Sequence, residues 1–309
     1  MKIAIIGAGA MGCLYGAKLS ESDRNQVLLV DVWEEHVKAI NDHGLFMEED
    51  GKLINYKKVR AVSKAEDVGP CDLAIVFVKS TMTGEAVRSN RSIFGAHTIV
   101  LTLQNGLGNV ELIEAELGDK NIIAGTTAHG ATMLGPGRIR HAGAGKTVIG
   151  ELTGDITDRL VRLADMMSSV GLETEVSDNV MGLIWDKLLV NVGINALTAI
   201  TGLHNGQLLD YPELEALLEA AVEEAHQVAL AKGICLQYED PVSHTKDVCK
   251  ATAANKSSML QDILNRKKTE IEMINGAVCR EGRSLGITTP VNSVLTNLIL
   301  YKQRYIKTD

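Results

Sequence analysis

Short apolar segments alternate with longer amphipathic segments over about the first 175 residues of this 309-residue chain. Continuous apolar runs predict buried strands, and apolar residues that recur every three or four positions predict helices. The predicted strands are Lys2–Ile6, Val27–Val30, Leu73–Val78, Thr98–Leu103, Ile122–Ala124 and Leu172–Val176. The predicted helices are Met11–Ser20, Glu34–His43, Thr83–Asn90, Val110–Leu117 and Ile156–Ser169. This alternation predicts an α/β domain, a parallel sheet with helices on both faces.

Two stretches of this first part predict β-hairpins instead. Residues 45–59 alternate on both sides of Asp50-Gly51, a pair that favours a two-residue hairpin turn. Residues 137–150 contain Gly143 and Gly145 between two apolar segments, and we expect the stretch to fold back at its glycines.

The pattern changes after about residue 179, where long segments with helical periodicity replace the strands. The predicted helices are Met181–Ala199, Pro212–Lys232, Pro241–Ala251, an uninterrupted Asn255–Arg283, and Pro290–Ile306. Proline is tolerated in the first turn of a helix, and Pro212 and Pro290 stand at such positions. We therefore expect two domains, residues 1–178 and 179–309, joined near Ser177–Asn179.

A glycine-rich segment joins the first predicted strand to the first predicted helix. It fits the pattern GxGxxG and consists of Gly7, Ala8, Gly9, Ala10, Met11 and Gly12. In this setting Gly7 makes the tight turn, Gly9 lets a pyrophosphate approach the backbone, and Gly12 lets the helix pack on the strand. The N–H groups of the helix N-terminus then face the phosphates. The segment predicts a Rossmann-type dinucleotide site.

An acidic residue, Asp31, follows the second predicted strand at once, 19 residues beyond Gly12. A carboxylate near this spacing accepts hydrogen bonds from the adenosine ribose hydroxyls. It would repel the 2′-phosphate of NADP(H), and Lys38 is the one nearby cation that could offset this repulsion. The residues therefore favour NAD(H).

Polar residues follow two further predicted strands, at the sheet edge where open α/β sheets bind ligands. "LAIVFVKS" places Lys79 there, and "TIVLTLQNG" places Gln104, Asn105 and Gly106. We expect Lys79 and Asn105 to lie where cofactor and substrate meet.

The first helix of the second domain carries Lys187, Asn191 and Asn195 at spacings of i, i+4 and i+8. These positions share one helix face, and the other faces are apolar. The pattern predicts a polar stripe that faces a cleft; the alternative is a helix edge that is simply exposed to water.

A second polar set lies in the predicted helix Asn255–Arg283. Asn255 and Ser258 are i, i+3 neighbours, and Glu270 lies further along. For Glu270 the alternative interpretation is an ordinary surface pair with Arg266 at i−4, worth a few tenths of a kcal/mol.

These motifs resemble the 2-dehydropantoate 2-reductase (ketopantoate reductase) family from end to end. The matching segments are "GAGAMG", "VKS", "QNG", "WDKLLVNVGINALTA", "NGQL" and "NKSSMLQDILNRKKTEIEMINGAV". The first is shared by many dinucleotide enzymes, whereas the two long helical segments are highly specific. The resemblance implies a Rossmann-type domain followed by an all-helical domain similar to the C-terminal domain of 6-phosphogluconate dehydrogenase. It also implies reduction of 2-dehydropantoate to (R)-pantoate in pantothenate and coenzyme A biosynthesis.

The resemblance also implies roles for single residues. Lys187 would be the general acid and Glu270 would bind the substrate hydroxyl. The other substrate-binding residues would be Asn105, Asn191, Asn195, Asn255 and Ser258, with Lys79 and Asn105 at the cofactor–substrate junction. The usual family cofactor is NADP(H), with a basic residue near the end of the second strand, so Asp31 departs from the pattern.

The residue types agree with this chemistry. A lysine cation can stabilise the developing alkoxide and supply its proton, while the hydride comes from the cofactor. Three alternatives stay open: reduction of another 2-keto acid, a β-hydroxyacid dehydrogenase, which also carries a Lys-x-x-x-Asn pair, and a non-enzymatic NAD(H) sensor.

Composition restricts the remaining classes of function. The net charge of −8 argues against nucleic acid as a partner, and five scattered cysteines indicate a reduced, cytoplasmic protein without a metal site. We expect no signal peptide and no apolar stretch that approaches the roughly 20 residues of a membrane span. The expected partners are a small 2-keto acid and a second copy, in a homodimer through the helical domain.

Overall fold

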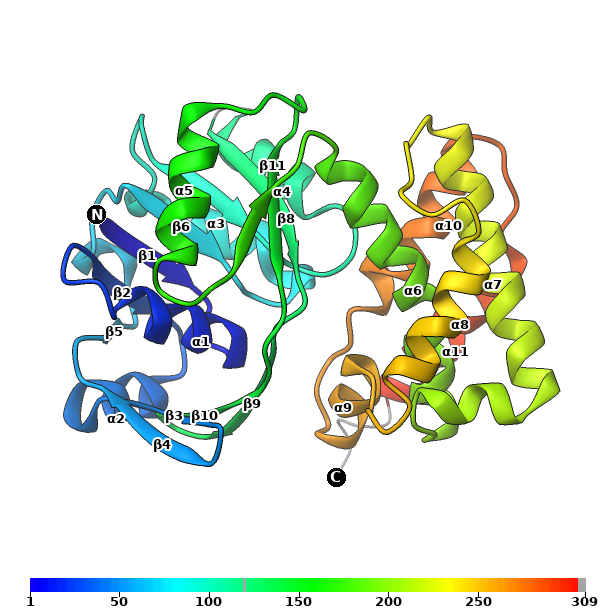
Figure 1. Ribbon diagram of the computed structural model, residues 1–309, viewed down its shortest axis with the longest axis horizontal. Coiled ribbons are helices and arrows are strands. Elements are labelled where there is room, and N and C mark those ends of the chain that lie inside the picture. Colours follow the sequence, from blue (N-terminus) through cyan, green and yellow to red (C-terminus); the bar gives the residue numbers. More distant parts are fainter. Residues whose placement is uncertain (119–120, 305–309) are drawn as a thin grey trace. The chain divides into compact units, whose positions relative to one another are not determined.

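The computed structural model describes residues 1–118 and 121–304, which form two compact units (Figure 1). The first unit consists of Met1–Gln104 and Asn109–Val180. The second unit joins the short segment Asn105–Gly108 to the chain from Met181 onward.

The first unit is built on a sheet of eight strands in the order β12-β11-β8-β7-β6-β1-β2-β5. These are β1 (Lys2–Ile6), β2 (Gln26–Val30), β5 (Arg60–Val62), β6 (Leu73–Val76), β7 (Ile99–Thr102), β8 (Ile122–Thr127), β11 (Thr147–Glu151) and β12 (Thr174–Val176). Six neighbouring strands of this sheet, β8, β7, β6, β1, β2 and β5, are parallel, and β11 is antiparallel to β8. Their order is that of two mononucleotide-binding halves whose connections diverge between β1 and β6. The predicted Rossmann-type fold is confirmed.

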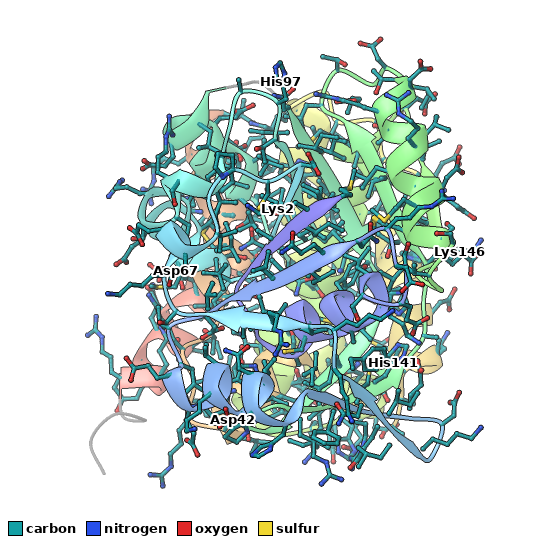
Figure 2. The ribbon with its side chains drawn as sticks, turned by 90° about the vertical axis from the view of Figure 1, so that its left-hand side faces the viewer. Lys2, Asp42, Asp67, His97, His141 and Lys146 are labelled. Carbon is teal, nitrogen blue, oxygen red and sulfur yellow. The ribbon has the colours of Figure 1, made fainter. Side chains whose placement is uncertain are left out.

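Alternate residues of each strand enter different cores because helices cover both faces. Ile3 and Ile5 of β1 pack in one apolar cluster, whereas Ala4 and Ile6 pack in another. The covering elements are α1 (Ala10–Leu19), α2 (Glu34–His43), α3 (Thr83–Ser89), α4 (Asn109–Leu117), α5 (Asp158–Ser168) and the short 3-10 turns Ala65–Asp67, Ser80–Met82 and Arg91–Ile93. Figure 2 faces this unit and shows β1, with Lys2 labelled, beside β2 and β5.

A second sheet of four strands, in the order β4-β3-β10-β9, also belongs to the first unit. The strands are β3 (Leu45–Glu49), β4 (Lys52–Tyr56), β9 (Gly130–Gly135) and β10 (Arg138–Gly143). The predicted hairpin at Asp50-Gly51 joins β3 and β4. The hairpin predicted within residues 137–150 is wrong: β10 pairs with β9 across Pro136-Gly137, and β11 joins the main sheet beside β8.

The second unit is helical, as predicted. It contains α6 (Val180–Thr201), α7 (Pro212–Ala231), α8 (Pro241–Ala251), α9 (Ser258–Leu264), α10 (Asn275–Ser284) and α11 (Pro290–Arg304), with 3-10 turns at Gly206–Asp210 and Ile271–Met273. The buried apolar side chains of α6, α7, α10 and α11 belong to one cluster. The predicted end of the last helix, Ile306, lies outside the described residues.

The uninterrupted helix predicted over Asn255–Arg283 is wrong. Helix α9 ends at Leu264, and Arg266 adopts a left-handed conformation with φ of 53°. The Arg266 N–H then donates to Ile263 O and the Lys267 N–H to Asp262 O, which closes a Schellman motif. Glycine usually occupies the left-handed position of this motif, so the arginine hid the break from a sequence-based prediction.

Helix α6 is long and apolar enough to cross a membrane by length and composition, which the sequence analysis did not anticipate. In this fold 67% of its most apolar window is buried inside the protein. Trp185, Leu188, Leu189 and Val192 each contribute to the apolar cluster of the second unit. Helix α6 is therefore the core helix of this unit.

Candidate functional site

The glycine-rich segment lies at the carboxyl end of β1, beside the point where the sheet order reverses. Gly7 has φ of 98°, and a Cβ atom there would lie 2.8 Å from the backbone nitrogen of Val78. A Cβ on Gly12 would lie 2.0 Å from Gly7 O, so α1 can pack this closely only with glycine. At Gly9, by contrast, a Cβ would meet nothing within 4 Å. The segment has the turn, the close helix packing and the open backbone that a pyrophosphate requires.

Asp31, directly after β2, reaches back to this segment. Its Oδ2 accepts a hydrogen bond of 2.7 Å from the Ala8 N–H, and its Oδ1 accepts one of 2.9 Å from the Trp33 N–H. A carboxylate has about four acceptor positions, so ribose hydroxyls can still bind it. Asp31 therefore supports the loop as well as carrying the predicted negative charge.

Two lysines could offset the negative charge of Asp31 and so attract a 2′-phosphate. Lys38, the candidate found in the sequence, forms an ion pair with Asp42 one helical turn further on. Lys64, which the sequence analysis did not consider, is exposed and follows β5, the strand beside β2. The pairing of strands, which a linear sequence does not reveal, is what brings Lys64 to this edge.

The ends of β6 and β7 are joined by Gln104. Its Nε2 donates to Val78 O at 2.7 Å and to Thr83 Oγ1 at 2.8 Å. Lys79, the next residue after Val78, is exposed at this edge of the first unit. Gln104, expected at this ligand-binding edge of the sheet, thus fixes the backbone before Lys79.

Asn105 belongs to the second unit, unlike Gln104 before it. The Leu107 N–H donates to Met273 O at 2.9 Å, and Gly106 has φ of 82°. A Cβ on Gly106 would lie 2.3 Å from that same carbonyl oxygen. The Asn105 loop is therefore held against the segment that follows Glu270.

Helix α6 carries Lys187, Asn191 and Asn195 as predicted. Lys187 and Asn191 are half-buried, whereas Asn195 is only 5% exposed. Asn191 and Asn195 follow Lys187 at intervals of one helical turn, so the three polar side chains share one face of α6. A lysine and two amides on one face of so apolar a helix are typical of a ligand site.

The charge of Lys187 is balanced by Glu270, which is 8% exposed. Burial lowers the pKa of Lys187 to about 8, and the negative charge of Glu270 acts in the opposite direction. The alternative, an exposed pair with Arg266 on one helix, assumes a continuous helix, but α9 ends at Leu264 and Glu270 is buried. After this break in the helix, Glu270 lies where its charge acts on Lys187.

Glu270 is positioned by its neighbour Thr269, which sequence reasoning missed. The Thr269 N–H and Oγ1–H both donate to Oε1 of Gln303 on α11, at 3.2 Å and 2.9 Å. The Glu270 carbonyl accepts from the N–H groups of Met273 and Ile274. Both sides of Glu270 are therefore fixed, and no local sequence signal marks Gln303 as the partner.

Asn255 and Ser258 are exposed at the start of α9 and are not on one helix with Glu270. One of the two residues between them, Ser257, was missed: it caps α9 through the Leu260 N–H, and its hydroxyl lies 2.7 Å from Thr198 Oγ1 on α6. Thr198 is one turn beyond Asn195, so this hydrogen bond ties the Asn255–Ser258 segment to the helix of Lys187.

A buried amide network holds α10 and α11 against α6. Asn275 Nδ2 donates to Val192 O at 3.1 Å and to Asn292 Oδ1 at 2.9 Å. Asn292 Nδ2 in turn donates to Glu224 Oε2 at 2.8 Å. The carboxylate of Glu224 also caps the first turn of α11. Sequence reasoning missed this network because its members lie on four different helices.

Comparison with known proteins gives this arrangement a family. The profile described as "Ketopantoate reductase PanE/ApbA" matches residues 3–154, and "Ketopantoate reductase PanE/ApbA C terminal" matches residues 179–303. The chain belongs to the ketopantoate reductase family. Proteins of this family are pyridine-nucleotide-dependent oxidoreductases that act on a small keto acid.

The similarity to individual relatives covers nearly the whole chain. The 2-dehydropantoate 2-reductase of Halobacterium salinarum is 36% identical over 305 residues, covering 98% of this chain and 99% of the relative. That of Pyrococcus abyssi is 35% identical over 307 residues, covering 98% of each.

Solved structures of ketopantoate reductase relatives have the same fold. The PanE/ApbA family ketopantoate reductase from Ralstonia eutropha JMP134 is 34% identical, with a TM-score of 0.92, covering 99% of this chain and all of that one. A ternary structure of D-mandelate dehydrogenase with NADH and anilino(oxo)acetate is also 34% identical, with a TM-score of 0.92 over both full chains.

The amine of Lys187 should titrate near pH 8 in the protein without ligands. Replacing Glu270 with Gln should lower this pKa further, because the compensating negative charge is removed while the shape is kept. Side-chain NMR of isotope-labelled lysine measures the pKa, with Lys187→Met identifying the resonance. A Lys187 signal that titrates near the ordinary value of 10.5, or that ignores the Glu270 change, would contradict the described contact.

Proposed function

We propose that this ketopantoate reductase reduces 2-dehydropantoate to (R)-pantoate with NADH, and that Lys187 supplies the proton. The observation that carries the proposal is the electrostatic interaction of Lys187, whose pKa is lowered to about 8, with the buried Glu270. Asn191 and Asn195 lie on the same face of α6 as Lys187. The first unit would hold the dinucleotide and the second unit would hold the keto acid.

The residues of the first unit fit a dinucleotide. Gly7, Gly9 and Gly12 form the turn and the open backbone, and Ala8, Ala10 and Met11 complete the segment whose N–H groups would face the pyrophosphate. Asp31 would bind the ribose hydroxyls, and Lys79 would stand at the nicotinamide side. When bound, the cofactor supplies the hydride.

Lys187 would act on the keto oxygen. Its ammonium group donates a hydrogen bond to that oxygen and transfers the proton as negative charge develops there. A pKa of about 8 leaves most of the side chain protonated at neutral pH, yet makes the proton easier to release than from an ordinary lysine.

The amides and the carboxylate would orient the substrate. Asn191 and Asn195 offer donors for the substrate carboxylate, with Asn255, Ser258 and Asn105 as further contacts in the second unit. Glu270 is an acceptor for the hydroxyl that ketopantoate carries beyond its gem-dimethyl carbon. A buried carboxylate left without this hydroxyl would be poorly solvated.

A second candidate is reduction of another 2-keto acid, such as an aryl one. The similarity to D-mandelate dehydrogenase, as high as that to the ketopantoate reductase from Ralstonia, favours it. Glu270 weighs against it, because an aryl keto acid has no hydroxyl for this carboxylate. The NADH in that neighbour is in line with the preference proposed from Asp31.

We place the enzyme in the cytoplasm, because its five scattered cysteines are typical of a protein kept in reducing conditions.

Replacing Lys187 with Ala should lower kcat by roughly two to four orders of magnitude, the usual effect of removing a general acid. In the wild type, kcat/KM for reduction should fall as the pH rises through about 8, because the amine loses the proton that it donates. Oxidation of pantoate should rise over the same range. Steady-state rates measure the loss of kcat and the pH dependence, and a thermal midpoint shows whether the variant is folded. Near-wild-type reduction by a folded Lys187→Ala enzyme would exclude Lys187 as the proton donor.

NADH should bind at least tenfold tighter than NADPH, a difference of about 1.4 kcal/mol. The reason is repulsion between Asp31 and a 2′-phosphate. Asp31→Asn keeps an acceptor for the Ala8 N–H but removes the charge, so it should narrow the ratio. Fluorescence titration measures the four dissociation constants, and Lys64→Ala shows how much NADPH binding depends on that cation. Equal affinities in the wild type would refute the argument.

Glu270→Ala should reduce the preference for ketopantoate over 3-methyl-2-oxobutanoate, which lacks the hydroxymethyl group. We expect kcat/KM to fall more on ketopantoate than on the analogue, by a factor that corresponds to about 1–3 kcal/mol of transition-state stabilisation, since only ketopantoate loses a hydrogen bond. The variant also lowers the pKa of Lys187, but this affects both substrates and cancels in the ratio. Glu270→Gln, which keeps an acceptor, is the matched control. An unchanged ratio in Glu270→Ala would remove Glu270 from substrate recognition.

We also propose a homodimer formed through the helical unit. Val294, Leu298 and Tyr301 form an apolar stripe on α11, exposed by 56%, 46% and 60%. Sedimentation should give a dimer for the wild type and a monomer for Leu298→Glu, whereas Ser293→Glu, exposed on α11 but outside the stripe, should leave the dimer intact. A monomeric wild type, or a dimeric Leu298→Glu, would disprove this interface.

A further inference from the structure

Two fully buried side chains beneath the glycine-rich segment have no part in the function proposed above. Cys13 lies on α1 and His36 on α2, and both are 0% exposed. The Cys13 Sγ lies 3.2 Å from Ala8 O and 3.4 Å from His36 Nε2. On the other side of the ring, His36 Nδ1 accepts a hydrogen bond of 2.9 Å from the Gly137 N–H, in the turn between β9 and β10.

The direction of these hydrogen bonds follows from Gly137. Because Nδ1 of His36 accepts, the ring proton must be on Nε2, which therefore faces Cys13 Sγ and also interacts with the backbone of Ala8. Cys13 in turn donates its S–H to Ala8 O. Burial raises the pKa of Cys13, which keeps it a thiol, and burial lowers the pKa of His36, which keeps the ring neutral. The chain of donors runs from Gly137 through His36 and Cys13 to Ala8.

These hydrogen bonds fix the second backbone polar group of Ala8. Its N–H is held by Asp31 Oδ2, and its carbonyl is held by Cys13. The peptide bond that follows is planar and trans, so the Gly9 N–H points opposite to the Ala8 carbonyl. With the carbonyl turned into the protein, the Gly9 N–H is turned outward. Gly9 is exposed, and its N–H has no partner among residues 1–118 and 121–304.

We propose that His36 is a positioning residue for the dinucleotide: acting through Cys13, it holds the Ala8 carbonyl inward and so aims the Gly9 N–H at the pyrophosphate. The inference rests on the proposed dinucleotide site and adds the residues that orient its backbone. It also makes Gly137 the far anchor of that site, although this turn belongs to the small four-stranded sheet. A preorganised donor binds an anion without first having to be reoriented.

Two substitutions of His36 separate the two ends of its ring. In His36→Gln the side-chain amide reaches the position of Nε2 and can donate toward Cys13. In His36→Asn the amide reaches only the position of Nδ1, where it can accept from Gly137. Both variants lose the imidazole ring and its stacking on Trp33. Asn also fills one methylene less of this buried site than Gln, so the thermal midpoint of each variant is measured beside its affinity.

Fluorescence titration with NADH tests the proposal. His36→Asn should weaken NADH binding roughly three- to tenfold, the effect of one misdirected hydrogen bond, and His36→Gln should stay within about twofold of the wild type. Both should keep the wild-type kcat at saturating NADH, so the loss appears in the KM for NADH. Equal affinities of the two variants, or weaker binding by His36→Gln, would overturn the proposal.

A second pair keeps the test decisive if a His36 variant does not fold. Cys13→Ser keeps a donor for the Ala8 carbonyl and should bind NADH nearly as the wild type does, whereas Cys13→Ala should bind roughly threefold or more weakly. Equal binding by this pair would also overturn the role of the chain. A wild-type protein that does not bind NADH would instead disprove the dinucleotide site itself, so the two failures are distinguishable.

Discussion

The ammonium group of Lys187 is held in the most apolar helix of the protein, and the rest of the second unit is arranged to keep it there. Removing a cation from water is costly unless a negative charge compensates for it. Glu270 is that charge, and its segment must turn sharply after α9 to reach α6. The Thr269–Gln303 and Asn275–Asn292 hydrogen bonds then fix the turn from two sides. The result is a lysine that is charged at neutral pH but releases its proton readily.

The first unit solves a corresponding problem with backbone groups. A pyrophosphate needs N–H groups that already point at it, and a short glycine-rich loop has many conformations. Here Asp31 holds one side of Ala8 and Cys13 holds the other. In both units, side chains that would not touch the ligand thus help to orient the groups proposed to act on it: Cys13 in the first unit and Gln303 in the second.

Local patterns in the sequence predict what depends on neighbouring residues. The alternation of strands and helices, the glycine-rich turn and the polar stripe Lys187, Asn191 and Asn195 are all found where the pattern places them. The continuous helix through Arg266 fails because its left-handed residue is not glycine. The hairpin over residues 137–150 fails because strand pairing depends on partners far along the chain.

The same distinction applies to the candidate site. Lys187 and Glu270 are 83 positions apart in sequence, and their proximity comes from tertiary structure that no spacing encodes. Gln303, Ser257 and His36 are likewise visible only through their partners. Sequence reasoning finds residues whose type suggests chemistry, but it misses the residues that orient them.

Glu270 and Lys187 together fit this site to reduce a hydroxylated aliphatic 2-keto acid. The most direct measurement is kcat/KM of the wild-type enzyme with NADH for ketopantoate and for phenylglyoxylate, the keto acid that corresponds to mandelate. The buried Glu270 carboxylate predicts the higher kcat/KM for ketopantoate. A higher value for phenylglyoxylate, or no oxidation of NADH with either acid, would contradict the account.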